Sequence, residues 1–377
     1  MTNNKDKKVL NVPNLRFPEF TGEWMKCKFG EIATGFDYGM NAAAKPYDGQ
    51  NKYIRITDID EASSTYNNSS IVSPDGILSE NYVVNEGDIL LARTGASTGK
   101  SYLYRKSDGK LYYAGFLIRA NVAEHNPYFV FSQLHTHRYW RWVSIMSARS
   151  GQPGINSLEY ASFPIFTTTL KEENKISSLL SLIDERITTQ NKIIEKLQSL
   201  IKGIAQNIVL RNKPNVRISQ CLECCSSTLQ ESDVLEYGTY PVYGANGVVG
   251  FLDNYNTSNE AIYIIKDGSG VGAVSYVAGK CSATGTLNIL QAKKGFSLRY
   301  LYYLLNIFNF EPYKTGMAIP HIYFKDYGKA QIFCPSYSEQ LKYAKFLATI
   351  DDKLLTEQNV LINLSLQKQY LPRQMFI

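Results

Sequence analysis

Residues 171–197 read KEENKISSLLSLIDERITTQNKIIEKL, and residues 338–364 read SEQLKYAKFLATIDDKLLTEQNVLINL. The two stretches align without a gap at a constant offset of 167 residues, so that Ile183 matches Ile350. A duplication with such a long period decides the architecture before any local feature does. We therefore expect the chain to contain two copies of one structural unit.

Each copy carries apolar residues at steps of three and four, the spacing of a helix that packs along one seam. Gln190 and Glu357 interrupt the two seams at the same step of the repeat. A polar seam residue lowers stability but can fix the register of paired helices. At about 1.5 Å per residue each helix can reach on the order of 50 Å, so we expect two long paired helices rather than two unrelated core helices. The predicted seam residues are Ile176, Leu179, Ile183, Ile187, Ile194, Leu197, Phe346, Ile350, Leu354, Leu361 and Leu364.

The regions ahead of the two helices also resemble each other. Residues 86–99, EGDILLARTGASTG, match residues 259–272, NEAIYIIKDGSGVG, as an apolar strand, a cation and a glycine-rich turn. Residues 150–156, SGQPGIN, echo residues 315–321, TGMAIPH. Short runs such as NKYIRITDI and GAVSYVAG indicate β-rich regions with long loops. We therefore expect an α+β protein in which a β-rich region precedes each long helix.

Composition narrows the class of protein. The 377 residues are 44% hydrophobic and 20% charged, which is too apolar for a disordered chain and too long for one compact core. Forty Lys and Arg residues against thirty-four Asp and Glu give a formal charge of +6, which does not establish a nucleic-acid partner by itself. The sequence shows no signal peptide and no membrane-spanning apolar run, so we expect a cytoplasmic protein with no membrane partner.

Several local motifs resemble chemical sites but depart from their patterns. Six cysteines without a framework spacing are expected to be reduced, and the single C-x2-C of Cys221 and Cys224 has no second ligand pair for zinc. Residues 95–101, GASTGKS, resemble a phosphate-binding loop but have three residues between the glycines instead of four. Residues 125–129, HNPYF, resemble the adenine clamp of amino-methyltransferases, but no glycine-rich S-adenosylmethionine loop precedes them. We therefore expect no metal site and no catalytic residues.

Four segments resemble the specificity (S) subunits of type I restriction-modification systems. Residues 334–354, CPSYSEQLKYAKFLATIDDKL, carry the proline-containing strand, Glu-Gln pair and Ile-Asp step of that family, and residues 164–187, PIFTTTLKEENKISSLLSLIDERI, repeat them. Residues 11–24, NVPNLRFPEFTGEW, are similar to the opening of many such subunits, and residues 241–247, PVYGANG, to a frequent target-domain segment. The first copy departs from the pattern because residues 171–173 are KEE where the second copy has SEQ.

The resemblance implies two target-recognition domains separated by two long antiparallel coiled-coil-like helices. Each domain would read one half of an asymmetric bipartite site in double-stranded DNA, and the helices would set the spacing of the halves. The expected segments are an amino-terminal tail (1–17), a first target-recognition domain (18–170), a central conserved helix (171–212), a second target-recognition domain (213–337) and a distal conserved helix (338–377).

The resemblance also implies partner subunits. The helices would dock two methylation (M) subunits, and restriction (R) subunits would join through that core. The chain would be a non-catalytic subunit of an adenine N6-methyltransferase and ATP-dependent endonuclease complex. S-adenosylmethionine, ATP and Mg would be bound by the partners, so the chain itself is expected to carry no cofactor.

Candidate DNA contacts are cationic, amide, hydroxyl and aromatic side chains on predicted strand ends and turns, because such groups bind phosphates and read base edges. In the first β-rich region they are Arg93, Thr94, Lys100, Arg105, Lys106, Lys110, Tyr112, Tyr113 and Arg119. In the second they are Tyr243, Asn246, Lys266, Ser269, Lys280, Lys314 and His321.

Two other classes of function stay open. The chain would be a non-catalytic protein-assembly scaffold if its paired helices joined a complex while the β-rich regions bound protein. It would be a nucleotide-using enzyme if Lys100 and the glycine-rich loop bound a phosphate. Salt-dependent binding of duplex DNA separates the DNA-binding hypothesis from the scaffold, because phosphate contacts release counterions.

Overall fold

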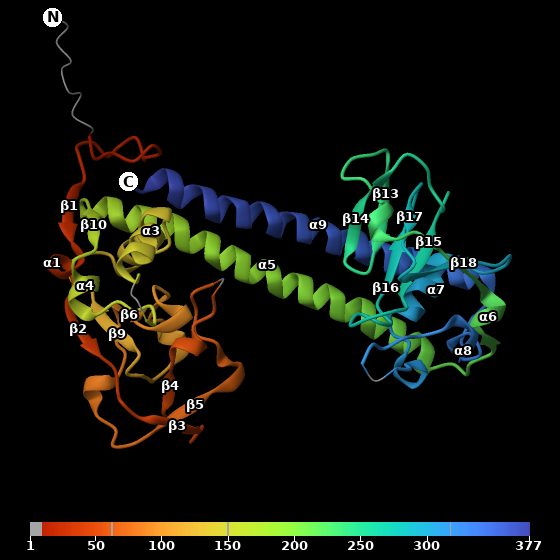
Figure 1. The fold of residues 1–377 in the computed structure, drawn as a ribbon, viewed down its shortest axis with the longest axis horizontal. Coiled ribbons are helices and arrows are strands. Elements are labelled where there is room, and N and C mark those ends of the chain that lie inside the picture. The colour runs from red at the N-terminus through yellow and green to blue at the C-terminus, as the bar shows by residue number, and fades with distance from the viewer. Residues whose placement is uncertain (1–9, 62, 149–150, 317) are drawn as a thin grey trace, which may run out of the picture. The chain divides into compact units, whose positions relative to one another are not determined.

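The computed structural model describes residues 10–61, 63–148, 151–316 and 318–377 (Figure 1). The chain divides into two compact units. Unit 1 contains the residues up to 188 together with 362–377, and unit 2 contains residues 189–361. No helix within the described ranges is both long and apolar enough to cross a membrane.

Two long helices account for the duplicated stretches. Helix α5 spans Leu170–Leu210 and helix α9 spans Tyr337–Met375, which confirms the prediction of two long helices. Helix α9 begins with a local cap, in which Ser336 Oγ donates to the Glu339 carboxylate at 2.6 Å and the Glu339 N–H donates to the Ser336 carbonyl at 2.9 Å. Both helices have an acidic residue in the first turn, where it interacts favourably with the helix dipole.

Within each unit the two helices run antiparallel. In unit 1 the Asp184 carboxylate lies 2.8 Å from Lys368 Nζ, and Ile176 shares a buried cluster with Met375. In unit 2, Gln190 Nε2 donates to the backbone carbonyl of Glu357 at 3.0 Å and also to its carboxylate. Gln190 and Glu357 are equivalent positions of the repeat. The two polar residues that were predicted to interrupt the two seams therefore contact each other.

The seam prediction fails at one residue. The other predicted seam residues are buried or half-buried, but Phe346 is 55% exposed while its neighbour Leu347 is 1% exposed. Ala344, one turn earlier, belongs to the core of unit 2. The first turns of α9 pack on the β-rich region of unit 2, so their buried face differs by one residue from the predicted helix–helix seam.

We expect Gln190→Leu to stabilise unit 2 by about 1 kcal/mol, because a buried polar residue costs stability in an otherwise apolar seam. Gln190 is buried, and the Glu357 carboxylate keeps its ion pair with Lys353 after the substitution. Urea unfolding measures the difference. Gln198→Leu, at an exposed position of the same helix, is the matched control, with an expected change below about 0.5 kcal/mol. A loss of stability in Gln190→Leu alone would contradict this account.

The β-rich region of unit 1 is built around a four-stranded antiparallel sheet in the order β2-β9-β6-β7. Strand β6 is buried along its whole length, as its apolar run predicts. The antiparallel pairs β1-β10 and β3-β5 and the parallel pair β4-β8 complete the strands. The strands are β1 (Met25–Lys28), β2 (Thr34–Tyr38), β3 (Ala43–Pro46), β4 (Lys52–Ile54), β5 (Val72–Asp75), β6 (Asp88–Ala92), β7 (Ser101–Leu103), β8 (Leu111–Tyr113), β9 (Leu117–Asn121) and β10 (Pro164–Thr167). The short helices are α1 (Phe29–Ile32), α2 (Pro127–Gln133), α3 (His137–Met146) and α4 (Ser157–Ala161).

Unit 2 has a central sheet in the order β12-β18-β15-β16, a second sheet in the order β14-β13-β17 and the pair β11-β19. The strands are β11 (Val216–Arg217), β12 (Leu222–Ser226), β13 (Tyr240–Gly244), β14 (Gly247–Leu252), β15 (Ala261–Ile265), β16 (Val274–Val277), β17 (Ser282–Ala283), β18 (Leu287–Ala292) and β19 (Gln331–Ile332). The short helices are α6 (Ile218–Cys221), α7 (Leu298–Leu305) and α8 (Phe324–Tyr327).

The two units share most of one topology, although β14 and the pair β3-β5 have no counterpart in the described part of the other unit. The central order β2-β9-β6-β7 corresponds to β12-β18-β15-β16, and the pair β1-β10 corresponds to β11-β19. The parallel pair β4-β8 corresponds to the parallel pair β13-β17. The predicted α+β architecture, with a β-rich region ahead of each long helix, is confirmed.

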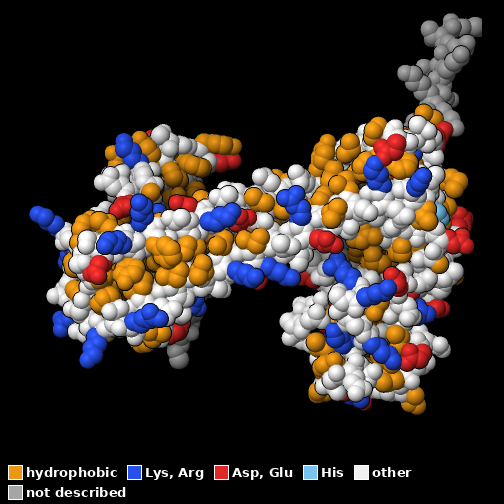
Figure 2. Space-filling model, turned by 180° about the vertical axis from the view of Figure 1, so that it is seen from behind, with side chains coloured by type: hydrophobic (Ala, Val, Ile, Leu, Met, Phe, Trp, Pro, Cys, Tyr) orange, Lys and Arg blue, Asp and Glu red, His pale blue; other side chains and the backbone are white. Residues whose placement is uncertain are grey.

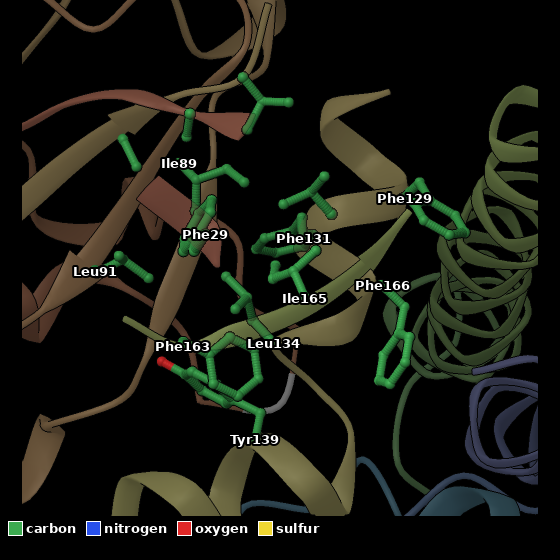
Figure 3. Packing of buried hydrophobic residues seen from close by; sticks show 14 of the residues in the cluster. Phe29, Ile89, Leu91, Phe129, Phe131, Leu134, Tyr139, Phe163, Ile165 and Phe166 are labelled. Carbon is green, nitrogen blue, oxygen red and sulfur yellow. The ribbon is translucent and has the colours of Figure 1, made fainter. Parts of the chain in front are cut away.

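Each unit has its own hydrophobic core. In unit 1 the buried Trp24 ring lies 5.3 Å from Phe129 and 6.2 Å from Phe376, in edge-on contacts. Figure 3 shows other side chains of this cluster, among them Phe131 and Tyr139, packed between the strands and the short helices. Because Trp24 and Phe376 come from the two ends of the chain, the amino-terminal segment and the end of α9 stabilise the same core.

The buried residues Glu173 and Gln340 occupy equivalent positions near the start of the two long helices, and their contacts explain why the third residue of KEE differs from that of SEQ. The Glu173 carboxylate accepts the backbone N–H of Thr168 at 3.2 Å. The equivalent Gln340 instead donates from Nε2 to the carbonyl of Pro335 at 2.9 Å. Proline has no N–H to donate and offers only its carbonyl. An amide with a donor therefore suits the second copy, and a carboxylate suits the first.

We expect Gln340→Glu to destabilise unit 2 by about 2–4 kcal/mol, because it places a buried carboxylate against the Pro335 carbonyl. Gln340 Oε1 also accepts the N–H of Ser297 at 2.9 Å, and one carboxylate oxygen retains that bond. Glu339→Gln, at the exposed neighbouring position, is the control, with an expected cost below about 1 kcal/mol. Equal unfolding midpoints for the two variants in urea would contradict the expected cost of a buried carboxylate at position 340.

Candidate nucleic-acid interface

A glycine-rich loop follows the central strand of each unit. In unit 1 the loop turns through Gly95 and Gly99, with φ of +69° and +92°, and in unit 2 through Gly268 and Gly272, with φ of +95° and +91°. Residues with a side chain rarely adopt this left-handed conformation, so the glycines fix the shape of the turn. The predicted match of the two loops is confirmed.

The same hydrogen bonds hold each loop against a later segment. The Gly95 N–H donates to the Pro153 carbonyl at 2.9 Å, and the Gly268 N–H donates to the Pro320 carbonyl at 3.0 Å. Pro153 and Pro320 are therefore equivalent positions, at the same offset of 167 residues as the long helices. The end-to-end match of residues 150–156 with residues 315–321 uses an offset that is two residues smaller, so these backbone bonds correct the predicted alignment. Positions 150 and 317 of that prediction lie outside the described residues.

The resemblance of residues 95–101 to a phosphate-binding loop does not extend to its hydrogen bonds. The N–H groups of Gly95, Thr98 and Gly99 all donate to acceptors within unit 1. Lys100 Nζ lies 3.3 Å from the Glu61 carboxylate. These amides are consequently engaged in holding the loop and are not directed at a phosphate. The loop is a tight turn at the end of β6.

Four cationic candidates of unit 1 have acidic partners. Lys100 pairs with Glu61, Lys106 with Glu86, Lys110 with Glu80 and Arg119 with Asp37. Exposed ion pairs contribute little and exchange easily, so the first three cations can still reach a phosphate. The Arg119 guanidinium also donates to the carbonyls of Asn81 and Val83. Its contacts are those of a residue that holds β9 against a neighbouring loop.

Two tyrosines in the list of candidate contacts are core residues. Tyr112 and Tyr113 are 1% and 0% exposed, because they lie on β8, which pairs with the buried strand β4. The Tyr113 hydroxyl is itself buried, and burial raises its pKa to about 12. Their assignment as DNA contacts is therefore wrong for this conformation. Thr94 is half-buried beside the loop and Arg105 is exposed.

Arg93 stands at the edge of a concave site. A pocket of about 590 Å³ is lined by polar, charged and aromatic residues, which are Tyr38, Asn41, Tyr53, Arg55, Thr57, Arg93 and Phe116, and by mostly apolar residues of the same segments. We call it the Arg93 pocket. The Arg93 guanidinium lies 4.7 Å from the centre of the Tyr38 ring. Of this set only Arg93 was predicted from the sequence, because the other side chains come from segments far apart in the chain.

The candidates of unit 2 fall into two groups. Lys266 and Ser269 belong to the Gly268 loop, and His321 joins them because its Nδ1 lies 2.6 Å from the Asp267 carboxylate. Lys314 precedes the residue that exchanges backbone bonds with His321. The second group lies near strand β13 and consists of Tyr243, Asn246 and Lys280.

The six cysteines are free thiols. Cys221 is buried in the core of unit 2, where its Sγ lies 3.8 Å from that of Cys334, and Cys224 is half-buried against the same core. Burial raises the pKa of Cys224 to about 11. Among the described residues, no group of three His, Cys, Asp or Glu side chains could hold a metal ion. Figure 2 shows Lys and Arg side chains scattered over the face in view rather than gathered in one basic patch.

Part of the chain is similar to a known protein family. Residues 215–364 match the type I restriction modification DNA specificity domain. The match covers less than half of the chain. The predicted resemblance of the chain to type I specificity subunits is confirmed, and the same topology recurs in unit 1.

Two curated relatives carry the same description. The chain is 25% identical over 126 residues to the EcoprrI type I restriction enzyme specificity subunit of Escherichia coli, which is 33% of the chain and 30% of that protein. It is 26% identical over 113 residues to a putative type I restriction enzyme specificity subunit of Haemophilus influenzae, which is 29% of each. The matches thus span less than a third of either relative.

Solved structures share the fold over nearly the whole chain. The type I S subunit of M. genitalium gives a TM-score of 0.69 at 17% identity and covers 97% of this chain and 99% of its own. A chain from a structure concerned with complex assembly and conformational transition of a type I system gives 0.54 at 15% identity and covers 94% and 96%. At these identities the likeness establishes the two-unit fold.

Proposed function

We propose that the chain is the DNA sequence-specificity subunit of a type I restriction-modification complex. Each β-rich region reads one half of an asymmetric bipartite site, and the two long helices set the spacing between the halves. The observation that carries the proposal is that the topology of the DNA specificity domain, matched at residues 215–364, is repeated in unit 1 with an equivalent loop after its central strand.

The residue chemistry supports this function. Each loop places a cation, Arg93 or Lys266, at the end of a buried strand, where rigid packing fixes its position. Two readers joined by one pair of helices gain affinity through effective concentration. The spacing of the half-sites then becomes part of the specificity.

The proposal assigns catalysis to partners. Two methylation subunits dock on the long helices and carry S-adenosylmethionine, and restriction subunits join through this core and use ATP and Mg. The chain itself positions DNA and performs no chemical step. The complex acts on DNA in the cytoplasm.

Salt dependence of DNA binding tests the proposal against a protein-assembly scaffold. The full chain, assembled with its methylation subunits, is titrated with duplex DNA at about 50 and about 200 mM salt. Affinity is expected to fall by at least about tenfold, because phosphate contacts release counterions. The M subunits alone are the control and are expected to bind the same duplex more weakly and without sequence preference. Equal binding with and without the chain would favour the scaffold.

A further inference from the structure

One of the two arginines that line the Arg93 pocket has no carboxylate partner among the described residues. Of its charged lining residues, Arg55 is balanced by two hydrogen bonds to the Asp58 carboxylate, at 2.8 and 2.7 Å. Arg93 forms no ion pair with any residue that the structure describes, and its Nε is buried without an acceptor. A buried N–H that lacks an acceptor is costly. The Arg93 guanidinium lines the pocket without a carboxylate partner among the described residues, so its charge favours a ligand that brings an acceptor atom to it.

Aromatic rings form the mouth of the same pocket. The Phe116 side chain is 56% exposed and the Tyr38 side chain 41%. The Tyr38 hydroxyl accepts the N–H of Ser157 at 3.3 Å, which holds the ring in place. Gly39, which also lines the pocket, lies against the main chain of Ala114, and a Cβ at this position would lie 2.2 Å from the Ala114 carbonyl oxygen. Exposed rings beside an arginine are a surface on which nucleic-acid bases stack.

Shape narrows the choice of ligand. The grooves of DNA are concave and are read by protruding helices, strands and loops. A pocket instead takes a part that projects from the duplex, which is either the phosphate backbone or a nucleotide turned out of the stack. A phosphate uses the arginine but gains nothing from aromatic rings. A base uses both, and a volume of about 590 Å³ is in the range of sites for small organic ligands.

We infer that the Arg93 pocket binds one nucleotide turned out of the DNA duplex, with its base against Phe116 and Tyr38 and an acceptor atom on Arg93. This inference rests on the proposed function. It adds a contact made by the specificity chain itself, in the half-site that unit 1 reads.

Unit 2 lacks this arrangement at the equivalent place. The N–H of Arg93 donates to the Phe116 carbonyl, and the N–H of the equivalent Lys266 donates to the Thr286 carbonyl. Threonine thus stands where unit 1 has its exposed ring. The position next to Lys266 carries an Asp267–His321 pair. The turned-out nucleotide belongs to one half-site only.

Fluorescence of 2-aminopurine tests the inference. The full chain with its methylation subunits is bound to duplexes that contain its recognised site, each with 2-aminopurine at one position. We expect fluorescence to rise several-fold on binding when 2-aminopurine occupies one position of the unit 1 half-site other than the methylated adenine. Phe116→Ala removes the rise, whereas Ile77→Ala, an exposed apolar residue of unit 1 outside the pocket, retains it.

A second measurement uses the cost of unpairing. Removing the base opposite that position is expected to strengthen DNA binding by the natural chain about tenfold, because less pairing energy is lost when the nucleotide turns out. The same change in the DNA is expected to leave the affinity of the Phe116→Ala variant unchanged. The inference is overturned if fluorescence rises only at the methylated adenine or if Phe116→Ala keeps the rise. It is also overturned if Arg93→Met weakens all duplexes equally and only reduces the salt slope, the result expected of a phosphate contact. In those cases site-specific binding persists and the proposed function stands, whereas loss of site-specific binding by the natural chain contradicts both.

Discussion

Exchanging residues 1–170 for the corresponding segment of a related chain is expected to change one half of the methylated DNA sequence and leave the other half unchanged. Unit 1 has its own sheet and its own core, so its loops can be replaced without altering those of unit 2. Each altered base pair costs about 1–3 kcal/mol. Two altered base pairs therefore reduce binding to the original site by at least about tenfold.

The donor segment has to preserve contacts with the retained helices. Arg16 forms a two-point ion pair with Glu172, and Trp24 packs against Phe376. A donor with Arg and Trp at these two positions keeps both contacts. Long-read methylation sequencing of cells that express the chimera and the M subunit reads both half-sites. A change in both halves would contradict the model of two independent readers.

The second large effect is expected from Glu172→Ala, which we predict destabilises unit 1 by about 3–5 kcal/mol. The Glu172 carboxylate is buried, accepts two hydrogen bonds from Arg16 at 2.7 and 2.8 Å, and also accepts from Thr168 and Trp24. Its removal leaves the largely buried Arg16 charge without its partner, which is the costly way to break such a pair. Urea unfolding of the full chain measures the loss.

The repeat supplies the matched control. Glu339 occupies the equivalent position in the second copy, but it is exposed and only caps the helix start through Ser336. Glu339→Ala is expected to cost about 1 kcal/mol. Equal losses in the two variants would show that the buried pair contributes no more than a cap.

The cost of Glu172→Ala also depends on pH. Burial alone would raise the pKa of Glu172, but hydrogen bonds from Arg16 and Thr168 outweigh it and lower the pKa. A lowered pKa in the folded state contributes stability above the unfolded value of about 4.3, and that stability is lost as pH falls through the folded pKa. The difference between the natural chain and Glu172→Ala should therefore shrink below about pH 4. A constant difference down to about pH 2 would contradict this assignment.

The sequence predicted the long helices and the matched loops because both have local signals. Steps of three and four mark a helix over many turns, and an apolar strand followed by glycines at fixed spacing marks a turn. The same reasoning failed at Phe346, where packing on the β-rich region of unit 2 rather than on α5 determines the buried face. Tyr112 and Tyr113 were misassigned because a three-residue buried strand resembles an exposed turn in sequence.

The Arg93 pocket had no comparable signal. Tyr38, Arg55 and Phe116 come from separate segments, and only the sheet pairing brings them together. The remaining candidate contacts and the domain boundaries stay predictions. The role of Arg16 was also not evident, because its partner Glu172 lies 156 residues away.

Long-read methylation sequencing tests the central claim most directly. A host without adenine methylation is given the candidate M subunit with and without this chain. The account predicts N6-methyladenine in an interrupted, asymmetric motif only when both are present. If the M subunit is active with another S subunit but yields no such motif with this chain, the assignment of DNA specificity is wrong.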